Sequence, residues 1–240
     1  MVRYREMKYF LLLTIAVLLF ASPAMGFCLV PQPRLVCAEY FASKVVVEAT
    51  LLKVRSIHDK DDPEGVAAYV YRLDANRVIR GHIDGVFRVY EGNDSGRATF
   101  AWKTGRKYVL FLFYSDSEKA WALDGCGNSG PISNAKAVLQ QIETIRASNG
   151  GGVIHGVISQ QFSGVRVEAR GTNGLYTART NAEGEFTMNV PAGRYAVRAI
   201  KRGFSFETAD FSYENPRDLR IESGGCAQIQ LVGESSQSPK

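Results

Sequence analysis

The residues of this chain best suited to chemistry are its four cysteines. They are Cys28, Cys37, Cys126 and Cys226. An even number of cysteines in an exported chain predicts two disulfides, and four cysteines allow three pairings that the sequence alone does not choose among. The first two enclose a Pro-x-Pro segment, which predicts a disulfide-pinned, extended lead strand. A metal site is not expected, because no Cys-x-x-Cys spacing occurs and the histidines are isolated from the cysteines.

A secretory signal comes directly before this segment. Three basic residues precede an apolar run from Tyr9 to Ala21, and small residues follow the run. This order predicts a signal peptide over residues 1–26 and a mature chain that begins at Phe27. The apolar run is shorter than the ~20 residues that a membrane-spanning helix needs. We therefore expect a secreted or periplasmic protein with no stable membrane insertion after signal cleavage.

The charge of the chain is weak and evenly spread. Lys and Arg number 29 against 24 Asp and Glu, and the formal net charge of +5 includes the basic signal. A nucleic-acid-binding protein would be expected to carry a stronger and more clustered positive charge. The composition therefore argues against a nucleic-acid partner.

Residues 27–148 predict a first domain of short strands closed by one helix. Apolar residues recur every three or four positions from Ile132 to Ile145, which is typical of an amphipathic helix. The segment 107–114 is apolar almost throughout, which predicts a strand buried on both faces. The expected strands are 45–54, 68–79, 85–90, 97–102, 107–114 and 119–123. Many short strands followed by a single helix favour a small closed barrel over an open sheet.

A glycine-rich linker over residues 149–152 separates this domain from a second one over 153–233. The second segment alternates apolar and polar residues between glycine-bearing turns, which is the pattern of a β-sandwich. Its expected strands are 153–158, 164–170, 175–179, 185–189, 194–199 and 227–232. The glycines predict independent motion of the two domains. Residues 234–240 predict a disordered polar tail.

Catalytic chemistry has little basis in the sequence. His58, His82 and His155 fall in unrelated loops and strands, and no nucleophile-elbow, phosphate-loop or zinc-protease motif occurs. We therefore expect no enzymatic activity, no catalytic residue and no cofactor.

Two further groups of residues could bind a ligand, and each has a simpler structural interpretation. An acidic loop could ligate calcium, but its spacing fits no EF-hand, and a solvated loop is the preferred reading. Its members are Asp59, Asp61, Asp62 and Glu64. Aromatic residues could form a binding face of a barrel, but at alternating strand positions they favour the core. These residues are Tyr69, Tyr71, Tyr90, Trp102, Tyr114 and Trp121.

The second domain resembles the carboxypeptidase regulatory-like family, a transthyretin-like sandwich. The resemblance covers about 152–232, and its most specific segment is Thr180–Ala199, with a tight hairpin turn expected at Asn181–Gly184 and a second turn at Pro191–Gly193. The implied fold is a seven-strand β-sandwich. The family name does not imply peptidase chemistry.

The first domain resembles the netrin-like domains of tissue inhibitors of metalloproteinases and their bacterial relatives. The resemblance covers 28–147 and rests on the Cys28–Cys37 segment, on Gly105-Arg-Lys-Tyr-Val-Leu-Phe111 and on Cys126-Gly-Asn-Ser-Gly-Pro-Ile132. It implies an OB-type barrel with a flanking helix, and it implies that Cys37 pairs with Cys126. Elimination then leaves Cys28 with Cys226.

The resemblances together imply an all-β protein with one helix that binds a protein or a glycan outside the cell. Inhibitors of the netrin-like family chelate a protease zinc through an N-terminal cysteine. The expected start at Phe27, one residue before Cys28, makes inhibition the alternative rather than the leading interpretation. The residues that would contact a partner are Phe27, Cys28, Leu29 and Val30. A carbohydrate-binding or enzyme accessory protein is the third possibility.

Overall fold

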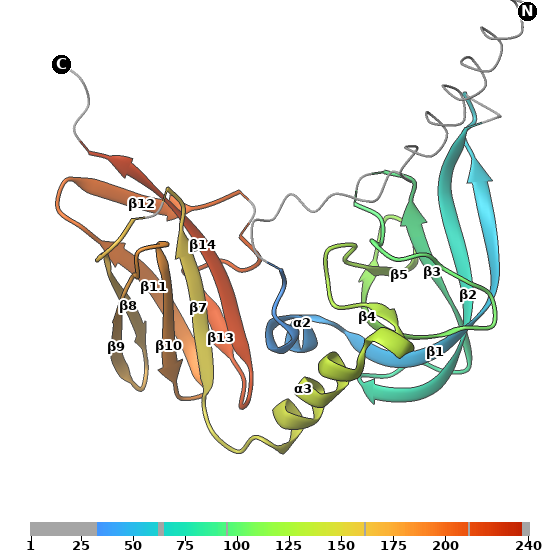
Figure 1. Cartoon of the computed structure of the whole chain (residues 1–240), viewed down its shortest axis with the longest axis horizontal. Helices are drawn as coiled ribbons and strands as arrows, with labels where there is room; N and C mark the ends of the chain where they lie inside the picture. The colour runs from blue at the N-terminus through green and yellow to red at the C-terminus, as the bar shows by residue number, and fades with distance from the viewer. Residues whose placement is uncertain (1–32, 62–64, 95, 161, 211, 237–240) are drawn as a thin grey trace, which may run out of the picture.

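The computed structural model describes residues 33–61, 65–94, 96–160, 162–210 and 212–236, and most of them lie in β-strands (Figure 1). The described helices are α2 (Val36–Ala42), α3 (Lys136–Ala147) and a short 3-10 helix, η1 (Ile132–Asn134). The expected β class is confirmed, and so is the helix after the first set of strands. Helix α2 was not predicted.

The first half of the chain forms a six-stranded sheet in the order β1-β2-β3-β5-β4-β6. Its strands are β1 (Val45–His58), β2 (Val66–Arg80), β3 (Val86–Gly92), β4 (Lys107–Ser115), β5 (Ala120–Leu123) and β6 (Gly130–Pro131). Strand β1 pairs antiparallel with both β2 and β4, so that Glu48 lies opposite Arg77 on one side and Val109 on the other. The long strand β1 therefore has a partner strand on each side.

Strands β1 and β4 separate two apolar cores. Successive side chains of a strand point to opposite faces, so Val45 and Val47 enter one core while Val46 enters the other. The second core is completed by α2 and α3, whose Ile142 is fully buried. Residues 108–112 of β4 are all buried, which confirms the prediction of a strand covered on both faces.

The second half of the chain forms two four-stranded sheets, which we call the C-terminal sheet pair. One has the order β10-β7-β14-β12 and the other β13-β11-β8-β9. Their strands are β7 (Gly152–Ile158), β8 (Arg166–Gly171), β9 (Gly174–Arg179), β10 (Glu185–Val190), β11 (Gly193–Ile200), β12 (Phe204–Thr208), β13 (Leu219–Ile221) and β14 (Cys226–Ser235). Ile154, Phe186 and Ile229 from the first sheet meet Val167 and Val197 from the second in one core.

The strands of this half are more numerous than the sequence suggested. The described residues contain eight strands in the two sheets, against the seven that the resemblance implied, and β12 and β13 were not predicted. The turn at Asn181–Gly184 is present, with the Gly184 amide donating to the Asn181 carbonyl at 3.2 Å. It connects β9 and β10, which belong to different sheets, so it is not a hairpin turn. Strand β14 continues to Ser235, two residues into the expected tail.

Two local predictions in the first half are wrong. Residues 97–102 form no strand, because the Ala98 amide donates to the buried Glu91 carboxylate at 2.7 Å instead of to a neighbouring strand. The end of the expected lead strand is helical, since α2 begins at Val36. No side chain caps the start of α2, and its Val36, Ala38 and Tyr40 are buried. Packing of one apolar face, rather than local signals, therefore stabilises this short helix.

Helices α2 and α3 lie between the six-stranded sheet and the C-terminal sheet pair (Figure 1). The glycine segment between α3 and β7 is closely packed at its end. A Cβ on Gly151 would lie 2.1 Å from the Val190 carbonyl oxygen, and the Gly224 amide donates to the Gly151 carbonyl at 3.0 Å. The segment that the sequence suggested as a hinge is thus restrained on both sides.

Candidate functional site

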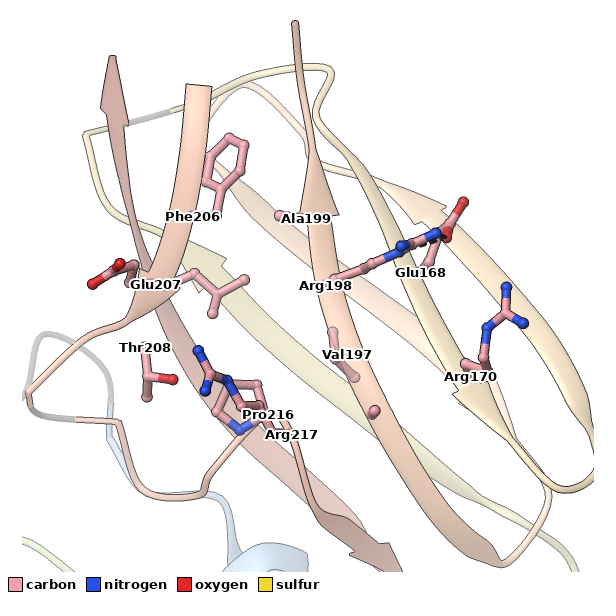
Figure 2. Close-up of a pocket in the computed structure, with 12 residues that line it drawn as sticks. Glu168, Arg170, Val197, Arg198, Ala199, Phe206, Glu207, Thr208, Pro216 and Arg217 are labelled. Atoms are coloured by element: carbon pink, nitrogen blue, oxygen red, sulfur yellow. Dashed lines mark hydrogen bonds and ion pairs between the residues drawn. The ribbon is translucent and has the colours of Figure 1, made fainter. Parts of the chain in front are cut away.

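An open cavity of about 380 Å³ lies at one edge of the C-terminal sheet pair, and we call it the edge cavity (Figure 2). Strands β8 and β11 form one side of it, β12 forms another, and the segment before β13 closes the third. The polar side chains at its wall are Glu168, Arg170, Arg198, Glu207, Thr208 and Arg217. Strand β8 and three later segments, which carry Arg198, Glu207 and Arg217, therefore bring charged groups together around one opening.

The backbone at this edge is only partly paired. Strand β13 pairs with β11 only at residues 193–195, and the Val197 amide then donates to the Pro216 carbonyl at 2.7 Å. Beyond that bond, Ala199 lies on a stretch of β11 that faces the cavity and that pairs with no described strand on that side. Strand β12 likewise pairs only with β14 among the described strands. The cavity therefore lies between two strand edges.

One carboxylate organises the charges on the strand side of the cavity. The buried Glu168 accepts from Arg198 Nη2 at 2.7 Å and forms an ion pair of the same length with Arg166 Nη2. The Arg198 hydrogen bond, helped by the charge of Arg166, holds the pKa of Glu168 below its usual range. Glu168 therefore remains ionised and fixes the two guanidinium groups on the outer face of the sheet.

Other charged groups at the cavity are not neutralised in this way. Among the described residues, Arg170, Arg217 and Glu207 form no ion pair. Arg170, Arg217 and Glu207 are all exposed. Their charges are available to a ligand without the breaking of an existing ion pair.

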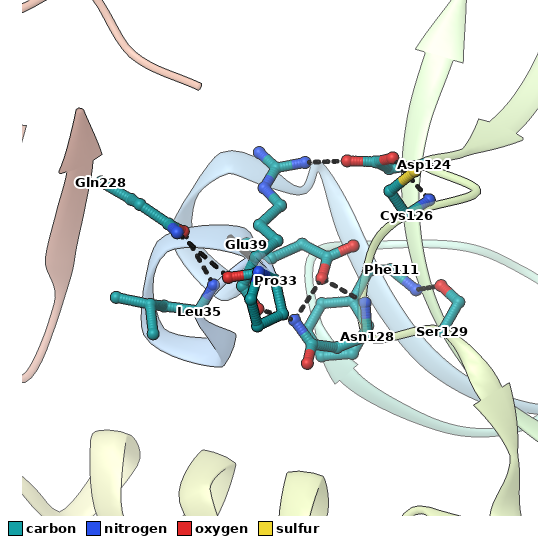
Figure 3. A network of polar contacts seen from close by, with 10 residues as sticks. Pro33, Leu35, Glu39, Phe111, Asp124, Cys126, Asn128, Ser129 and Gln228 are labelled. Atoms are coloured by element: carbon teal, nitrogen blue, oxygen red, sulfur yellow. Dashed lines mark hydrogen bonds and ion pairs between the residues drawn. The ribbon is translucent and has the colours of Figure 1, made fainter. Parts of the chain in front are cut away.

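A second group of contacts lies where residues 33–39 meet both halves of the protein, and we call it the polar junction (Figure 3). Its members are Arg34, Leu35, Glu39, Asp124, Asn128 and Gln228. Arg34 Nη1 donates to Asp124 Oδ2 at 2.9 Å. Glu39 Oε2 accepts from the Asn128 backbone amide at 2.6 Å and from its side-chain amide at 2.7 Å. Helix α2 is thereby held against the loop that precedes β6.

Glu39 is almost entirely buried, at 1% exposure. Burial raises the pKa of its carboxyl group, and the hydrogen bonds from Asn128 only partly oppose this. Its second oxygen, Oε1, has no hydrogen-bond partner in the described structure. Glu39 is therefore an ionisable group placed where its charge is unfavourable.

Gln228 of β14 extends the polar junction to the C-terminal sheet pair. Its side chain accepts from the Leu35 amide at 2.9 Å and donates to the Pro33 carbonyl at 3.0 Å. Its own backbone amide donates to the carboxylate of Glu214, whose pKa burial raises. One side chain thus satisfies two backbone groups that lie almost two hundred residues earlier in the chain.

The disulfide at this junction corrects both predicted pairings. Cys37 in α2 is bonded to Cys226 at the start of β14, with a Cα–Cα distance of 5.3 Å. Cys37 therefore does not pair with Cys126, and Cys226 does not pair with Cys28. The physical reason is the unpredicted helix, which carries Cys37 against β14. Cys126 also belongs to a disulfide, while Cys28 lies outside the described residues.

The expected partner-binding segment precedes the described part of the structure. Phe27, Cys28, Leu29 and Val30 all lie outside the described residues. The chain that follows them is docked from Pro33 onward, since Gln228 and the Cys226 disulfide hold it against the C-terminal sheet pair.

The three histidines are not brought together. His58 ends β1, the exposed His82 lies 3.0 Å from Asp84, and His155 lies on β7 beside Thr187 Oγ1 at 3.0 Å. Burial lowers the pKa of His155. Of the acidic loop, Asp59 and Asp61 are described, and the Asp61 amide donates to Asp59 Oδ1 at 2.9 Å. The described ranges hold no group of three or more His, Cys, Asp or Glu side chains suited to a metal.

The core interpretation of the central aromatic residues is confirmed. Trp102 stacks on Tyr71 at 4.3 Å between ring centroids, and Trp121 packs against the same core. Tyr114 and Tyr90 are exceptions. Tyr114 is 39% exposed and meets Trp121 edge-on, and the half-buried Tyr90 belongs to none of the described core clusters. The other rings therefore form the interior of the six-stranded sheet rather than an open binding face.

No family model matches the chain, and no curated protein matches it. In the described part of the chain, no helix is long and apolar enough to cross a membrane.

The edge cavity was not predicted from the sequence. A signal was present, since Arg166, Glu168 and Arg170 alternate along β8 and Arg194 and Arg198 share one face of β11. The alternation shows that these residues share a face, but the pairing of β8 with β11 is needed to bring them together.

Proposed function

We propose that this chain is an exported, non-catalytic two-domain binding protein of the extracellular space or cell envelope. Its N-terminal part is a netrin-like OB-type barrel, and its C-terminal part is a carboxypeptidase regulatory-like sandwich. The two disulfides support export, because such bonds form and persist in oxidising compartments.

The strand pairings support the barrel. Strand β1 pairs with β2 and with β4, β2 pairs with β3, and β5 pairs with both β3 and β4. The sequence of pairings returns to the strand where it began, as a closed barrel requires. Helix α3 on one side agrees with the flanking helix of the resemblance.

The shared core supports the sandwich. Side chains from both four-stranded sheets meet in one apolar layer, and β10 alternates strictly between exposed and buried positions. This is the pattern expected of two antiparallel-rich sheets packed face to face.

The edge cavity is the single observation that carries the binding function. It is open, three of the charged side chains at its wall (Arg170, Glu207 and Arg217) form no ion pair among the described residues, and it lies between two strand edges. Sites that bind ligands are typically concave and contain a few convergent polar groups. The Cys37–Cys226 bond and Gln228 fix the cavity relative to the rest of the protein.

An array of immobilised glycans and peptides, probed with the full oxidised protein, tests this function. Thr208 is exposed at the cavity wall, so Thr208→Trp should fill the opening and weaken the strongest signals about tenfold or more. Ser205→Trp is the matched control, because Ser205 is exposed on the same strand but does not line the cavity. The proposal is contradicted if no probe binds above background, or if Thr208→Trp binds as well as the wild type.

A further inference from the structure

The outer face of the sheet β13-β11-β8-β9 is rich in arginine, and we call it the arginine face. Its four strands contain six arginines and no lysine: Arg166, Arg170, Arg179, Arg194, Arg198 and Arg220. The acidic groups among them are Glu168, Asp218 and Glu222. The face therefore carries an excess of positive charge, and it is continuous with the edge cavity through Arg170 and Arg198.

The strand register places like charges directly opposite each other. Arg166 of β8 lies across from Arg179 of β9, and Arg194 of β11 lies across from Arg220 of β13. Like charges at directly opposite positions destabilise a sheet. Ion pairs of Arg166, Arg194 and Arg220 with nearby carboxylates offset part of this repulsion, and a ligand that brings negative charge would offset more of it.

Three of the guanidinium groups, those of Arg166, Arg194 and Arg198, are held in place before any ligand arrives. Glu168 fixes Arg166 and Arg198, and Asp218 accepts from Arg194 Nε and Nη2 at 3.2 and 3.0 Å. The side chains of Arg166 and Arg198 still remain 51% and 65% exposed. Their outward N–H groups are therefore free to donate, and little conformational entropy remains to be lost on binding.

Arginine, rather than lysine, indicates the chemistry of the ligand. The planar guanidinium donates two parallel hydrogen bonds to a carboxylate, sulfate or phosphate, which an ammonium group does not. Arg170 lies between the exposed Ala196 and Leu175 on the neighbouring strands, so its guanidinium group is open to a ligand. An extended chain of anionic groups fits such a surface.

The face is poorly suited to single-stranded nucleic acid. Bases bind by stacking on exposed aromatic rings. The aromatic residues of these four strands are Tyr176 and Tyr195, and both pack against the inner core. The six arginines therefore contact a ligand through charge and hydrogen bonds rather than through stacking.

We propose that the arginine face and the adjoining edge cavity bind an anionic polysaccharide that carries carboxylate or sulfate groups. This inference rests on the proposed binding function and gives its ligand class. The chain lies along β8 and β11, and its acidic groups pair with Arg170, Arg198 and Arg217. Because the contacts are exposed charges, binding weakens as salt is added.

Titration of the full oxidised protein with polygalacturonate and with dextran sulfate tests the proposal. Uncharged dextran and duplex DNA are the comparison ligands. Each charge-assisted contact that is lost should weaken binding about tenfold, so Arg170→Ala combined with Arg217→Ala should weaken it roughly a hundredfold. The matched control is Arg72→Ala combined with Arg88→Ala, which removes the same charge from directly opposite, exposed positions of β2 and β3.

The expected result is salt-sensitive binding of at least one acidic polysaccharide, lost in the first double variant and retained in the control. Equal loss in both double variants would show a general effect of charge and would overturn the proposal. Tighter binding of dextran or duplex DNA, or no binding of either acidic chain, would also overturn it. If a peptide or neutral glycan instead binds on the array, and Thr208→Trp blocks that binding, the proposed binding function holds and the acidic polysaccharide is the wrong ligand.

Discussion

Cys37 and Cys226 are bonded across 189 residues, and this bond joins the first helix of the described chain to its last strand. The bond lies beside Gln228, which holds the backbone of Pro33 and Leu35. The protein is therefore tied together near both ends of the described sequence. The disulfide and Gln228 thus connect the two halves at the polar junction.

Removal of this disulfide should cost much of the stability. Cys37→Ser combined with Cys226→Ser opens a very long loop, which the chain-entropy model values at about 5 kcal/mol and measured disulfides at about 2 to 4. Denaturant unfolding of the oxidised wild type and of the double variant measures the difference. A loss below about 1 kcal/mol would mean that the bond contributes little to the folded state.

Gln228 should couple the two halves independently of the disulfide. Gln228→Ala leaves the Pro33 carbonyl and the Leu35 amide without their partner and should cost about 2 kcal/mol. In the background without the Cys37–Cys226 bond, it should also widen the distribution of shapes seen by small-angle scattering. Gln230→Ala is the control, since Gln230 bonds Ser159 within the C-terminal sheet pair. Identical scattering for the two variants would argue against the coupling.

The loop at Gly127 should not accept a side chain. A Cβ there would lie 2.1 Å from Glu39 Oε1, and hydrogen bonds to Asn128 hold that carboxylate in place. Gly127→Ala should therefore lower the unfolding free energy by about 1 to 3 kcal/mol. A Cβ on Gly130 would meet no atom within 4 Å, so Gly130→Ala should leave stability nearly unchanged. The melting curves of the Gly127→Ala and Gly130→Ala variants are compared, and equal curves would contradict the close contact between Gly127 and Glu39.

Glu39 should make stability depend on pH. Because its pKa is raised in the folded state, the folded chain holds the proton more tightly than the unfolded chain. Its contribution is full below the unfolded pKa and is lost as pH rises through the folded pKa. The advantage of Glu39→Gln over the wild type in unfolding free energy should therefore grow with pH across that interval.

Glu168 provides a control of opposite sign for this pH dependence. Its pKa is lowered in the folded state, so its contribution is present above the unfolded pKa and lost as pH falls through the folded pKa. Glu168→Gln should therefore be most harmful at neutral pH. Denaturant titrations at several pH values test both variants, and a pH-independent difference for Glu39→Gln would refute the assignment.

Much of the regular structure could be predicted from the sequence. The alternation from Glu185 to Val190 predicts β10, and the three- and four-residue spacing around Ile142 predicts α3. These signals are local, and they record which face of an element is buried. Strand β4 was predicted equally well, because continuous apolar sequence marks a strand that is covered on both faces.

The remaining features depend on contacts between distant segments. Helix α2 has no side-chain cap, and it forms because its apolar residues are covered, so no local pattern marks it. The pairing of Cys37 then follows from where that helix lies. The arginine face can be predicted only in part from the sequence. Alternate charged positions are evident in β8, but the strand register that sets Arg198 opposite Glu168 is not.

Amide hydrogen exchange with and without a bound acidic polysaccharide tests the location of the site most directly. The full oxidised protein is compared alone and saturated with whichever of polygalacturonate and dextran sulfate binds more tightly. Slower exchange is expected at residues 196–199 of β11 and 206–208 of β12, which border the edge cavity, and no change is expected in β1, β2 and β3. Protection confined to the six-stranded sheet, or spread evenly over the chain, would contradict it.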